Sequence, residues 1–306
     1  MANILCAGVA VLDEVFRVRE FPTPDAKAAA SEFITIGGGC AANAAIAMAR
    51  LGGKVRFAAP LGGPAGSDVI GDRLVEGLAR EGVDCIGCVR VPGAHTPVSA
   101  IFIDARGDRT IATYRDHRLD ASMPDDPNRL VAGMDAVLVD NCFPDFVAPI
   151  CRAALAHRIP VVLDADRPTD DRHALFGAAT HVIFSTECLR ATARTDDLAA
   201  GLAHMGKFTN AFLAVTNGPH PVLWRDCGRG TIRETPVFAI ETVDTLAAGD
   251  VFHGAFALAL VEGREVEDAL RFAASAAGLK CSRFGGSTAA PRRGEVDALL
   301  AHFEPT

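Results

Sequence analysis

The second half of the chain alternates between short apolar runs and longer amphipathic stretches. The runs 135–140, 160–164, 181–184 and 210–216 are rich in valine, isoleucine and leucine, and stretches with helical spacing separate them. Strands that alternate with helices in this way form a parallel sheet covered on both faces. The run 3–12 is equally continuous and predicts a further central strand. We therefore expect a doubly wound, mainly parallel α/β fold.

Two weakly alternating, β-rich insertions interrupt this rhythm in the first half of the chain. They cover residues 15–36 and 95–114, and the second contains a hairpin signal at Ala105–Asp108. We expect the insertions to form a small β-sheet that acts as a lid over the main sheet. No repeat, linker or low-complexity segment divides the sequence, so a single domain over residues 1–306 is predicted.

The chain ends in two long predicted helices, residues 249–262 and 265–281, and the first of them is apolar on nearly every face. A helix of that kind has to be buried. The turn 243–248 leads into it, and the N-terminus of a buried helix offers free N–H groups and a positive dipole end to an anion. Asp250 at this position would repel a phosphate. Its presence is explained if it accepts a proton from a hydroxyl group that then attacks the phosphate.

Composition and charge argue against nucleic acids and membranes as partners. The net charge of −8 and the pI of about 5.6 disfavour nucleic acid or an anionic membrane surface. No apolar run approaches the roughly 20 residues of a membrane span. The N-terminal run lacks a basic segment and ends at Asp13 and Glu14, unlike a secretory signal. The nine cysteines follow no disulfide spacing, so reduced thiols and a cytoplasmic location are expected.

Common phosphate-binding motifs do not account for a nucleotide site in this sequence. Gly37–Gly39 followed by Ala42 fits the dinucleotide pattern, but the next strand, which ends near Gly62, lacks the acidic residue that this pattern requires. The sequence contains no P-loop. Asn43 falls in an alanine-rich helix, and Asp13 follows the first apolar run. Each alone is compatible with an ordinary structural hydrogen bond, but together they suggest a polyhydroxylated ligand.

Two segments resemble the signatures of the ribokinase-like (PfkB) family of ATP-dependent sugar kinases. Residues 38–53 match the family's N-terminal signature, and residues 243–250, Val-Asp-Thr-Leu-Ala-Ala-Gly-Asp, match its C-terminal signature, with Ala247 in place of the commoner glycine. The resemblance spans essentially the whole chain. It implies a doubly wound α/β domain with a β-sheet lid, ATP and Mg²⁺ as cofactors, a sugar as substrate and a homodimer formed through the lid.

The resemblance also implies roles for individual residues. Asp250 would be the catalytic base, and the anion hole for the γ-phosphate would be formed by the N–H groups of Ala247, Ala248 and Gly249. Sugar hydroxyls would be held by Asp13, Gly38, Gly39 and Asn43, and the nucleotide by Ser185, Thr216, Gly218 and Ser275. A site for a monovalent cation such as K⁺, behind the anion hole, would be formed by Asp244 and the backbone near Leu246, Lys280, Arg283 and Gly285.

Departures from the family pattern affect the metal site and the choice of substrate. The N-x-x-E segment, which the family uses near Mg²⁺, is reduced to Ser185–Cys188, with Glu187 as a candidate ligand. Cys40 stands where a lysine or asparagine is common, so ribose itself is not assured.

The C-terminal motifs are most similar to the sulfofructose kinase branch, and Lys27 matches one of its basic positions. In the segments 111–114 and 140–143, the arginine and the asparagine that would complete a sulfonate site are missing from the matching positions. Sulfofructose or a fructose-type ketose therefore stays an alternative to other sugars. A nucleoside is a further alternative, which the aromatic content of 6% disfavours. The expected reaction is transfer of the γ-phosphate to a hydroxyl group of the sugar, which is expected to be terminal. The alternative from a different class of protein is one that binds a sugar or nucleotide without catalysis.

Overall fold

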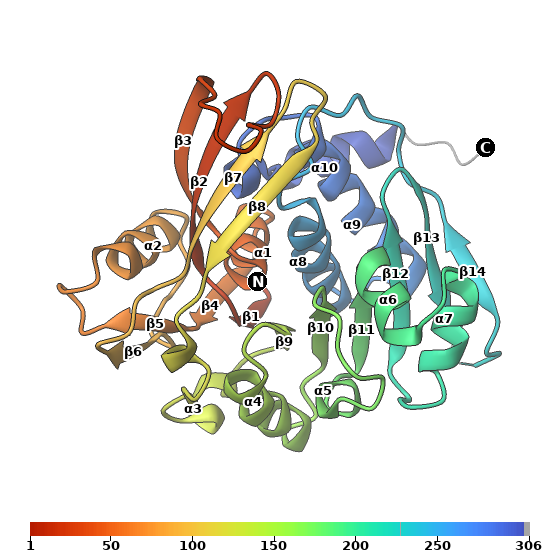
Figure 1. Cartoon of the computed structure of the whole chain (residues 1–306). Coiled ribbons are helices and arrows are strands. Elements are labelled where there is room, and N and C mark those ends of the chain that lie inside the picture. The colour runs from red at the N-terminus through yellow and green to blue at the C-terminus, as the bar shows by residue number, and fades with distance from the viewer. Residues whose placement is uncertain (227, 303–306) are drawn as a thin grey trace.

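The computed structural model describes residues 1–226 and 228–302, and an eight-stranded sheet forms the centre of the molecule (Figure 1). Its strands are β1 (Asn3–Ala7), β4 (Lys54–Ala58), β9 (Ala136–Asp140), β10 (Val161–Ala165), β11 (His181–Phe184), β12 (Phe212–Asn217), β13 (His220–Arg225) and β14 (Ile232–Thr235). They lie in the order β14-β13-β12-β11-β10-β9-β1-β4. Neighbouring strands from β4 to β12 are parallel, and β13 and β14 continue the sheet in antiparallel pairs.

Helices cover both faces of this sheet, because successive residues of the central strands are apolar on both sides. Ile4 and Cys6 of β1 belong to one apolar core, and Leu5 and Ala7 belong to the other. The first core contains residues of α1 (Cys40–Arg50), α2 (Val69–Arg80), α8 (Ala248–Val261), α9 (Val266–Cys281) and α10 (Arg293–Ala301). The second contains residues of α3 (Pro127–Val131), α4 (Pro144–Ala156), α5 (Ala174–Gly177), α6 (Thr186–Ala193) and α7 (Leu198–Met205). The predicted doubly wound α/β fold is therefore confirmed.

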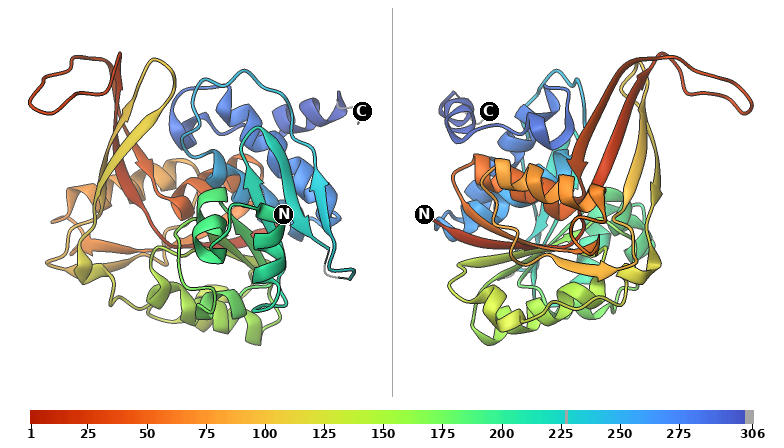
Figure 2. Two further views of the ribbon diagram at one scale, coloured as in Figure 1. Left: turned by 45° about the vertical axis from the view of Figure 1, so that its right-hand side comes forward. Right: turned by 90° about the vertical axis from the view of Figure 1, so that its left-hand side faces the viewer.

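A separate four-stranded sheet projects from one side of the main body (Figure 2). Its strands, in the order β3-β2-β7-β8, are β2 (Val11–Val18), β3 (Ala30–Gly38), β7 (Val98–Ile103) and β8 (Arg109–Tyr114). We call this sheet the lid. A small apolar core of Val15, Ile101 and Ile103 packs against Leu246 and Phe284 of the main body. The lid thus contacts the turn that leads into α8.

The structure corrects two details of the predicted strands. The apolar run 3–12 is not one strand, because the chain leaves the main sheet at Gly8 and enters the lid as β2. A side chain at Gly8 would overlap the carboxylate of Asp140, which explains the glycine at this crossing point. Asp13 consequently lies inside a lid strand and not just beyond a strand of the main sheet. After α2, the short strand β6 (Val89–Pro92) pairs with β5 (Pro60–Gly63).

Candidate active site

Helix α8 places Asp250 in its first turn, at the N-terminal end of a helix that is buried from Val251 to Ala259. The residue before the helix, Ala247, has φ 65° and ψ 10°, in the left-handed region. This backbone conformation favours glycine, which explains why glycine is the commoner residue here in the family signature. The left-handed residue turns the chain sharply, so that the loop before α8 approaches the helix end from the side of the lid.

Backbone N–H groups at this helix end are available to an anion. The N–H of Ala248 donates to the carbonyl of Thr245 at 3.2 Å. Among the described residues, the N–H groups of Ala247 and Gly249 have no acceptor. A Cβ added at Gly249 would meet nothing within 4 Å, so the space above the turn is open. Free N–H groups, the helix dipole and open space together form a site for a phosphate group.

The carboxylate of Asp250 is held in place by Asn43 of α1. The Nδ2 group of Asn43 donates to Oδ2 of Asp250 at 2.7 Å, although the two residues are 207 positions apart. Asn43 is only 5% exposed, and its Oδ1 atom has no hydrogen-bond partner in the described structure. A buried polar atom without a partner needs an explanation, and an incoming hydroxyl group would supply one. Helices α1 and α8 can approach closely because Gly254 leaves room for the carbonyl of Ala44.

The electrostatic surroundings suit Asp250 to accept a proton. Burial raises its pKa to about 7, the hydrogen bond from Asn43 acts against this rise, and the charges of Asp166 and Asp140 add to it. A general base is most effective when its pKa lies near the working pH, because it is then both deprotonated and basic. Asp250 therefore has the protonation behaviour of a base that works near neutral pH.

Two further carboxylates next to Asp250 were missed by the analysis of the sequence. Asp140 ends β9 and Asp164 lies near the end of β10, and both are almost completely buried. Asp140 accepts N–H groups from Val9, Ala41 and Cys142 at 2.7, 3.1 and 2.9 Å, and so fixes the loop after β1 and the start of α1. Ligands gather at the carboxyl ends of parallel strands, so an acid at each strand end was a usable signal.

Asp164 has a different environment from Asp140. Its Oδ1 atom lies 3.4 Å from Nε2 of His253, and its Oδ2 atom has no partner among the described residues. Burial raises its pKa, and the neighbouring charge of Asp250 raises it further. Single ligand atoms of Cys40, Asp164 and Asp250 all lie within 4.8 Å of one another. Carboxylate oxygens suit Mg²⁺ whereas a cysteine sulfur does not, so Asp164 and Asp250 are the residues at this place that would hold a magnesium ion.

The structure brings the residues predicted to bind a sugar together, with one exception. Asp13 is 5% exposed, and burial raises its pKa to about 7 while a hydrogen bond from Ser99 acts against the rise. A side chain at Gly38 would overlap the Asp13 carboxylate, and the carbonyl of Gly39 accepts the N–H of Asn43 at 2.8 Å. Asp13, Gly38, Gly39 and Asn43 are therefore neighbours. The exception is Lys27, whose side chain is exposed in the loop between β2 and β3.

Three of the residues predicted to bind a nucleotide lie at the carboxyl ends of β11 and β12, which are neighbouring strands. Ser185 caps α6 by accepting the N–H of Cys188 at 3.2 Å, and Thr216 accepts a hydrogen bond on its carbonyl from the Thr186 hydroxyl at 2.7 Å. Gly218 is exposed with a φ of 57°.

The remaining predicted residues of the nucleotide and metal sites lie apart from this group. Ser275 is fully buried in α9, where its hydroxyl donates to the carbonyl of Arg271 at 2.7 Å. Its side chain is thus already engaged within its own helix. Glu187, the candidate magnesium ligand, is exposed in the first turn of α6.

The predicted cation loop is built around Asp244, which is 4% exposed. Its carboxylate accepts the N–H groups of Leu246 at 2.8 Å and Gly285 at 3.1 Å, and contacts Nζ of Lys280 at 2.9 Å. Burial alone would raise the pKa of Asp244, but the Lys280 charge and the backbone donors hold it below its usual value. Arg283 lies between Lys280 and Gly285 in the sequence, and its guanidinium is paired with Glu295 at 2.5 Å.

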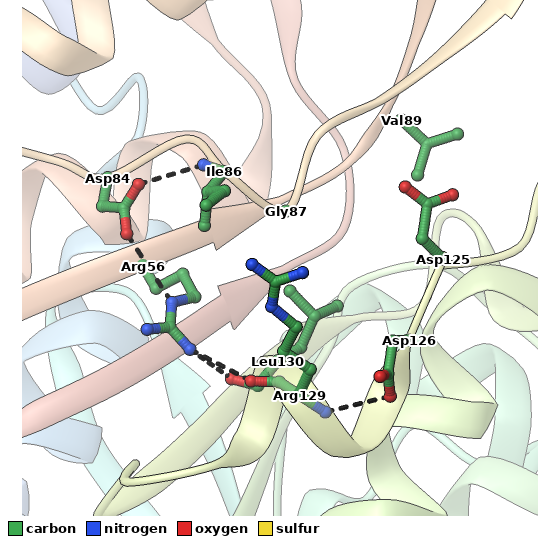
Figure 3. A pocket seen from close by; sticks show the side chains of 9 residues that line it. All are labelled: Arg56, Asp84, Ile86, Gly87, Val89, Asp125, Asp126, Arg129 and Leu130. Carbon is green, nitrogen blue, oxygen red and sulfur yellow. Dashed lines mark hydrogen bonds and ion pairs between the residues drawn. The ribbon is translucent and has the colours of Figure 1, made fainter.

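A hollow elsewhere on the surface, between β4 and α3, contains none of the predicted site residues (Figure 3). Acidic and basic side chains line it together, and two of them, Arg56 and Asp84, form an ion pair. Arg56 donates to the carbonyl of Leu130 at 2.9 Å and lies 3.6 Å from Asp84, and Asp126 accepts the N–H of Arg129 at 3.0 Å. This hollow therefore lies apart from the candidate active site.

The fold and the site together define an α/β protein in which the carboxylate of Asp250 lies at the open N-terminus of a buried helix and is bonded to the buried amide of Asn43. The model of the pfkB family carbohydrate kinases matches residues 1–293. A ribokinase of Bacillus subtilis is 30% identical over 305 residues, which cover 98% of this chain and 100% of the relative. The chain belongs to the pfkB family of carbohydrate kinases and is an ATP-dependent sugar kinase.

Solved structures agree with this family assignment. A candidate ribokinase from Agrobacterium tumefaciens superimposes with a TM-score of 0.93 at 35% identity, and the match covers 98% of this chain and 97% of the other. A ribokinase of Arabidopsis thaliana, determined with ribose and ATP, superimposes with a TM-score of 0.84 at 25% identity, and the match covers 99% of this chain and 100% of the other. Within residues 1–226 and 228–302, no helix combines the length and apolarity needed to cross a membrane.

Proposed function

We propose that this kinase transfers the γ-phosphate of ATP to a terminal hydroxyl group of a sugar, with Asp250 as the general base. The observation that carries the proposal is the position of Asp250, which lies at the open N-terminus of α8 and is fixed by Asn43 at 2.7 Å. The hydroxyl gives its proton to the carboxylate as its oxygen attacks the phosphorus atom. The N–H groups of Ala247 and Gly249, which have no acceptor among the described residues, stabilise the charge that develops on the phosphate.

We propose an uncharged sugar as the substrate. Asp13 and the unpartnered Oδ1 of Asn43 accept hydrogen bonds from hydroxyl groups, as a polyol requires. The carboxylates of Asp140, Asp164 and Asp250 lie close to the same place, and they would repel an anionic substrate. Relatives named as ribokinases make ribose the first sugar to test. Fructose and sulfofructose are the alternatives that the sequence itself raised.

ATP would lie over the carboxyl ends of β11 and β12, where Ser185, Thr216 and Gly218 are found. Magnesium, when bound, neutralises charge on the phosphates during transfer. Asp164, with its unpartnered oxygen, and Glu187, at the start of α6, are the carboxylates available to the metal or to its water ligands. The hydroxyl of Ser275 already donates to the carbonyl of Arg271, which makes Ser275 the least suited of the predicted nucleotide residues.

The lid supports the proposal because it contacts the loop that precedes α8. Arg109 of β8 donates to the hydroxyl of Thr245 at 2.5 Å, and Leu246 packs on the apolar core of the lid. A sugar bound at Asp13, which is part of the lid, would therefore lie beside the phosphate-binding turn. Exclusion of water by the lid prevents hydrolysis of ATP, in which water would replace the sugar as acceptor.

The test is ATP consumption measured with a panel of ribose, fructose, sulfofructose, nucleosides and sugar phosphates. We expect the highest kcat/KM with an uncharged sugar and a phosphorylated product at its terminal hydroxyl. Preference for sulfofructose or a sugar phosphate would contradict the uncharged substrate but keep the kinase. Binding of sugar and ATP without turnover of any compound would identify a protein that binds sugar without catalysis.

A further inference from the structure

Lys280 lies near the end of α9, and its side chain is completely buried. The other lysines of the chain, Lys27, Lys54 and Lys207, are all exposed. A charged ammonium group is costly to remove from water unless the protein supplies oxygen partners. The place of this one buried lysine therefore has to be explained by the atoms that it contacts.

Within the described residues, the hydrogen bond and the ion pair of the ammonium group are both with Asp244. Nζ of Lys280 donates to the Asp244 carbonyl at 2.7 Å and lies 2.9 Å from the Oδ2 atom of its carboxylate. The same carboxylate accepts N–H groups from Leu246 at 2.8 Å and from Gly285 and Gly286 at 3.1 and 3.2 Å. The pair thus connects the end of α9, the turn at residues 285–286 and the loop before α8.

The loop fixed in this way carries the phosphate-binding turn. Asp244 is followed by Thr245, which contacts the lid through Arg109, and by Ala247 in its left-handed conformation. Backbone atoms of residues 243 and 244 are also bonded to the end of α9, since both N–H groups donate to the carbonyl of Cys281 at 2.8 and 3.1 Å. Displacement of Asp244 would therefore displace the N–H groups that receive the phosphate.

These contacts do not fit a metal ion at the same place. A K⁺ ion and an ammonium group carry the same single charge, and each needs oxygen atoms as partners. The carbonyl and carboxylate oxygens of Asp244, which the sequence suggested as cation ligands, already face the ammonium of Lys280. A second cation beside them would be repelled by the first. Two of the expected backbone ligands are engaged as well, because the carbonyl of Lys280 accepts the N–H of Arg283 at 3.1 Å and the carbonyl of Gly285 accepts the N–H and the hydroxyl of Thr288 at 3.1 and 2.6 Å.

We propose that the ammonium group of Lys280 takes the place of a monovalent cation, so that this kinase orders its phosphate-binding loop without K⁺. Lys280 acts on the reaction through Asp244 and the turn at residues 247–249, and it is a positioning residue that does not touch the substrate. Its expected effect on the rate of phosphate transfer rests on the proposed function, whereas its expected effect on stability does not.

The first experiment uses the unaltered protein in KCl and in choline chloride at equal ionic strength. We expect the initial rate and the midpoint of thermal unfolding to be the same in both salts, to within about twofold in rate. Activation of tenfold or more by K⁺, or a rise in the unfolding midpoint specific to K⁺, would overturn the proposal, because each means that a metal ion binds where the ammonium is.

The second experiment uses Lys280→Met, which keeps the length of the side chain and removes the charge. We expect kcat to fall in choline chloride with little change in KM, and K⁺ or NH₄⁺ to restore it in a saturable manner. The unfolding midpoint should rise with K⁺ in this variant, since an ion that binds only the native state stabilises it. Lys207→Met, at an exposed lysine, is the matched control and should respond to neither salt.

The outcomes separate this proposal from the proposed function. Suppose that Lys280→Met loses activity and stability and that no monovalent cation restores them. The lysine would then be only structural, and the proposal that its ammonium takes the place of a cation would be overturned. If no sugar is turned over in any salt, the proposed function fails, while the thermal midpoints still decide the role of Lys280. If the variant does not fold, the comparison of salts on the unaltered protein decides.

Discussion

At the scale of single residues, the reaction depends on one carboxylate with an unusual environment. Asp250 is surrounded by an amide from Asn43, open N–H groups and the neighbouring acids Asp140 and Asp164. Each contact has a separate consequence. The amide fixes the direction of the carboxylate, the N–H groups attract the phosphate, and burial among acids raises the pKa of the base.

We predict that Asp250→Asn lowers kcat by about 10²- to 10⁴-fold, because general base catalysis is lost while the shape of the residue is kept. The KM for the sugar should change little, and the fold should be retained. Asp145→Asn is the control, because Asp145 is also an acid in the first turn of a helix but is exposed on α4. Steady-state kinetics of both variants check the prediction, and near-normal turnover by Asp250→Asn would exclude this residue as the base.

The pH dependence follows from the pKa of Asp250, which burial raises to about 7. Only the deprotonated form accepts a proton, so kcat/KM should fall as the pH falls below about 7, by roughly tenfold per pH unit. Asp13 also has a pKa of about 7, and the same measurement on Asp13→Asn separates the two groups. The fall should persist in that variant. A rate that stays constant down to about pH 5 would contradict the assignment of Asp250 as the base.

At the scale of elements, close approach of strands and helices places the substrate residues. Strand β3 ends beside β2, and the absence of a side chain at Gly38 leaves space for the Asp13 carboxylate. Helix α1 begins directly after Gly39 and brings Asn43 to Asp250. The glycine turn at residues 37–39 thus serves the sugar pocket, and not a dinucleotide.

We predict that Gly38→Ala raises the KM for the sugar by about tenfold or more, since the new Cβ displaces a charged hydrogen-bonding partner of the substrate. Gly77→Ala on α2 is the matched control, because a Cβ there meets nothing within 4 Å. The control should keep its KM and gain up to about 1 kcal/mol of unfolding free energy from the higher helix propensity of alanine. Equal KM values for the two variants would show that Asp13 does not bind the sugar.

At the scale of the whole molecule, the lid presents an apolar outer surface. Strand β8 is exposed along its full length. Tyr114 and Phe33 are 55% and 53% exposed, and they lie on the face of the lid opposite to its core residues Val15 and Ile101. Exposed apolar patches of this kind mark surfaces that bind a partner. A second copy of the chain, with its lid facing this one, is the partner that the sequence analysis expected.

We predict a dimer in solution that Phe33→Asp combined with Tyr114→Asp converts to a monomer, because two buried charges would replace apolar contacts. Met123→Asp is the control, since Met123 is 53% exposed but lies outside the lid. Light scattering coupled to size-exclusion chromatography measures the mass of each form. A monomeric unaltered protein would contradict the prediction.

The pattern of apolar residues was sufficient for the fold class and for the buried helix α8 after its turn, because both depend on neighbours in the chain. Continuous apolar runs require a sheet buried on both faces, and an apolar helix that starts after a glycine-containing turn must expose N–H groups at its buried end. The role of Asp250 as a base followed from the same local logic. The conformation of Ala247 also had a local signal, since glycine is the commoner residue at this place in the family.

Long-range contacts were decided only by the tertiary structure. Asn43 and Asp250 are 207 residues apart, and Asp140 reaches Ala41 across 99 residues. The direction of the Lys280 side chain had no signal in the periodicity of α9, which predicts burial but not the partner. Asp13 was expected beside the main sheet and lies in the lid, because the chain changes sheets at Gly8 within one apolar run. The sequence alone thus determined the kind of reaction, through local patterns, whereas the packing of distant segments determined which groups surround the substrate and the phosphate.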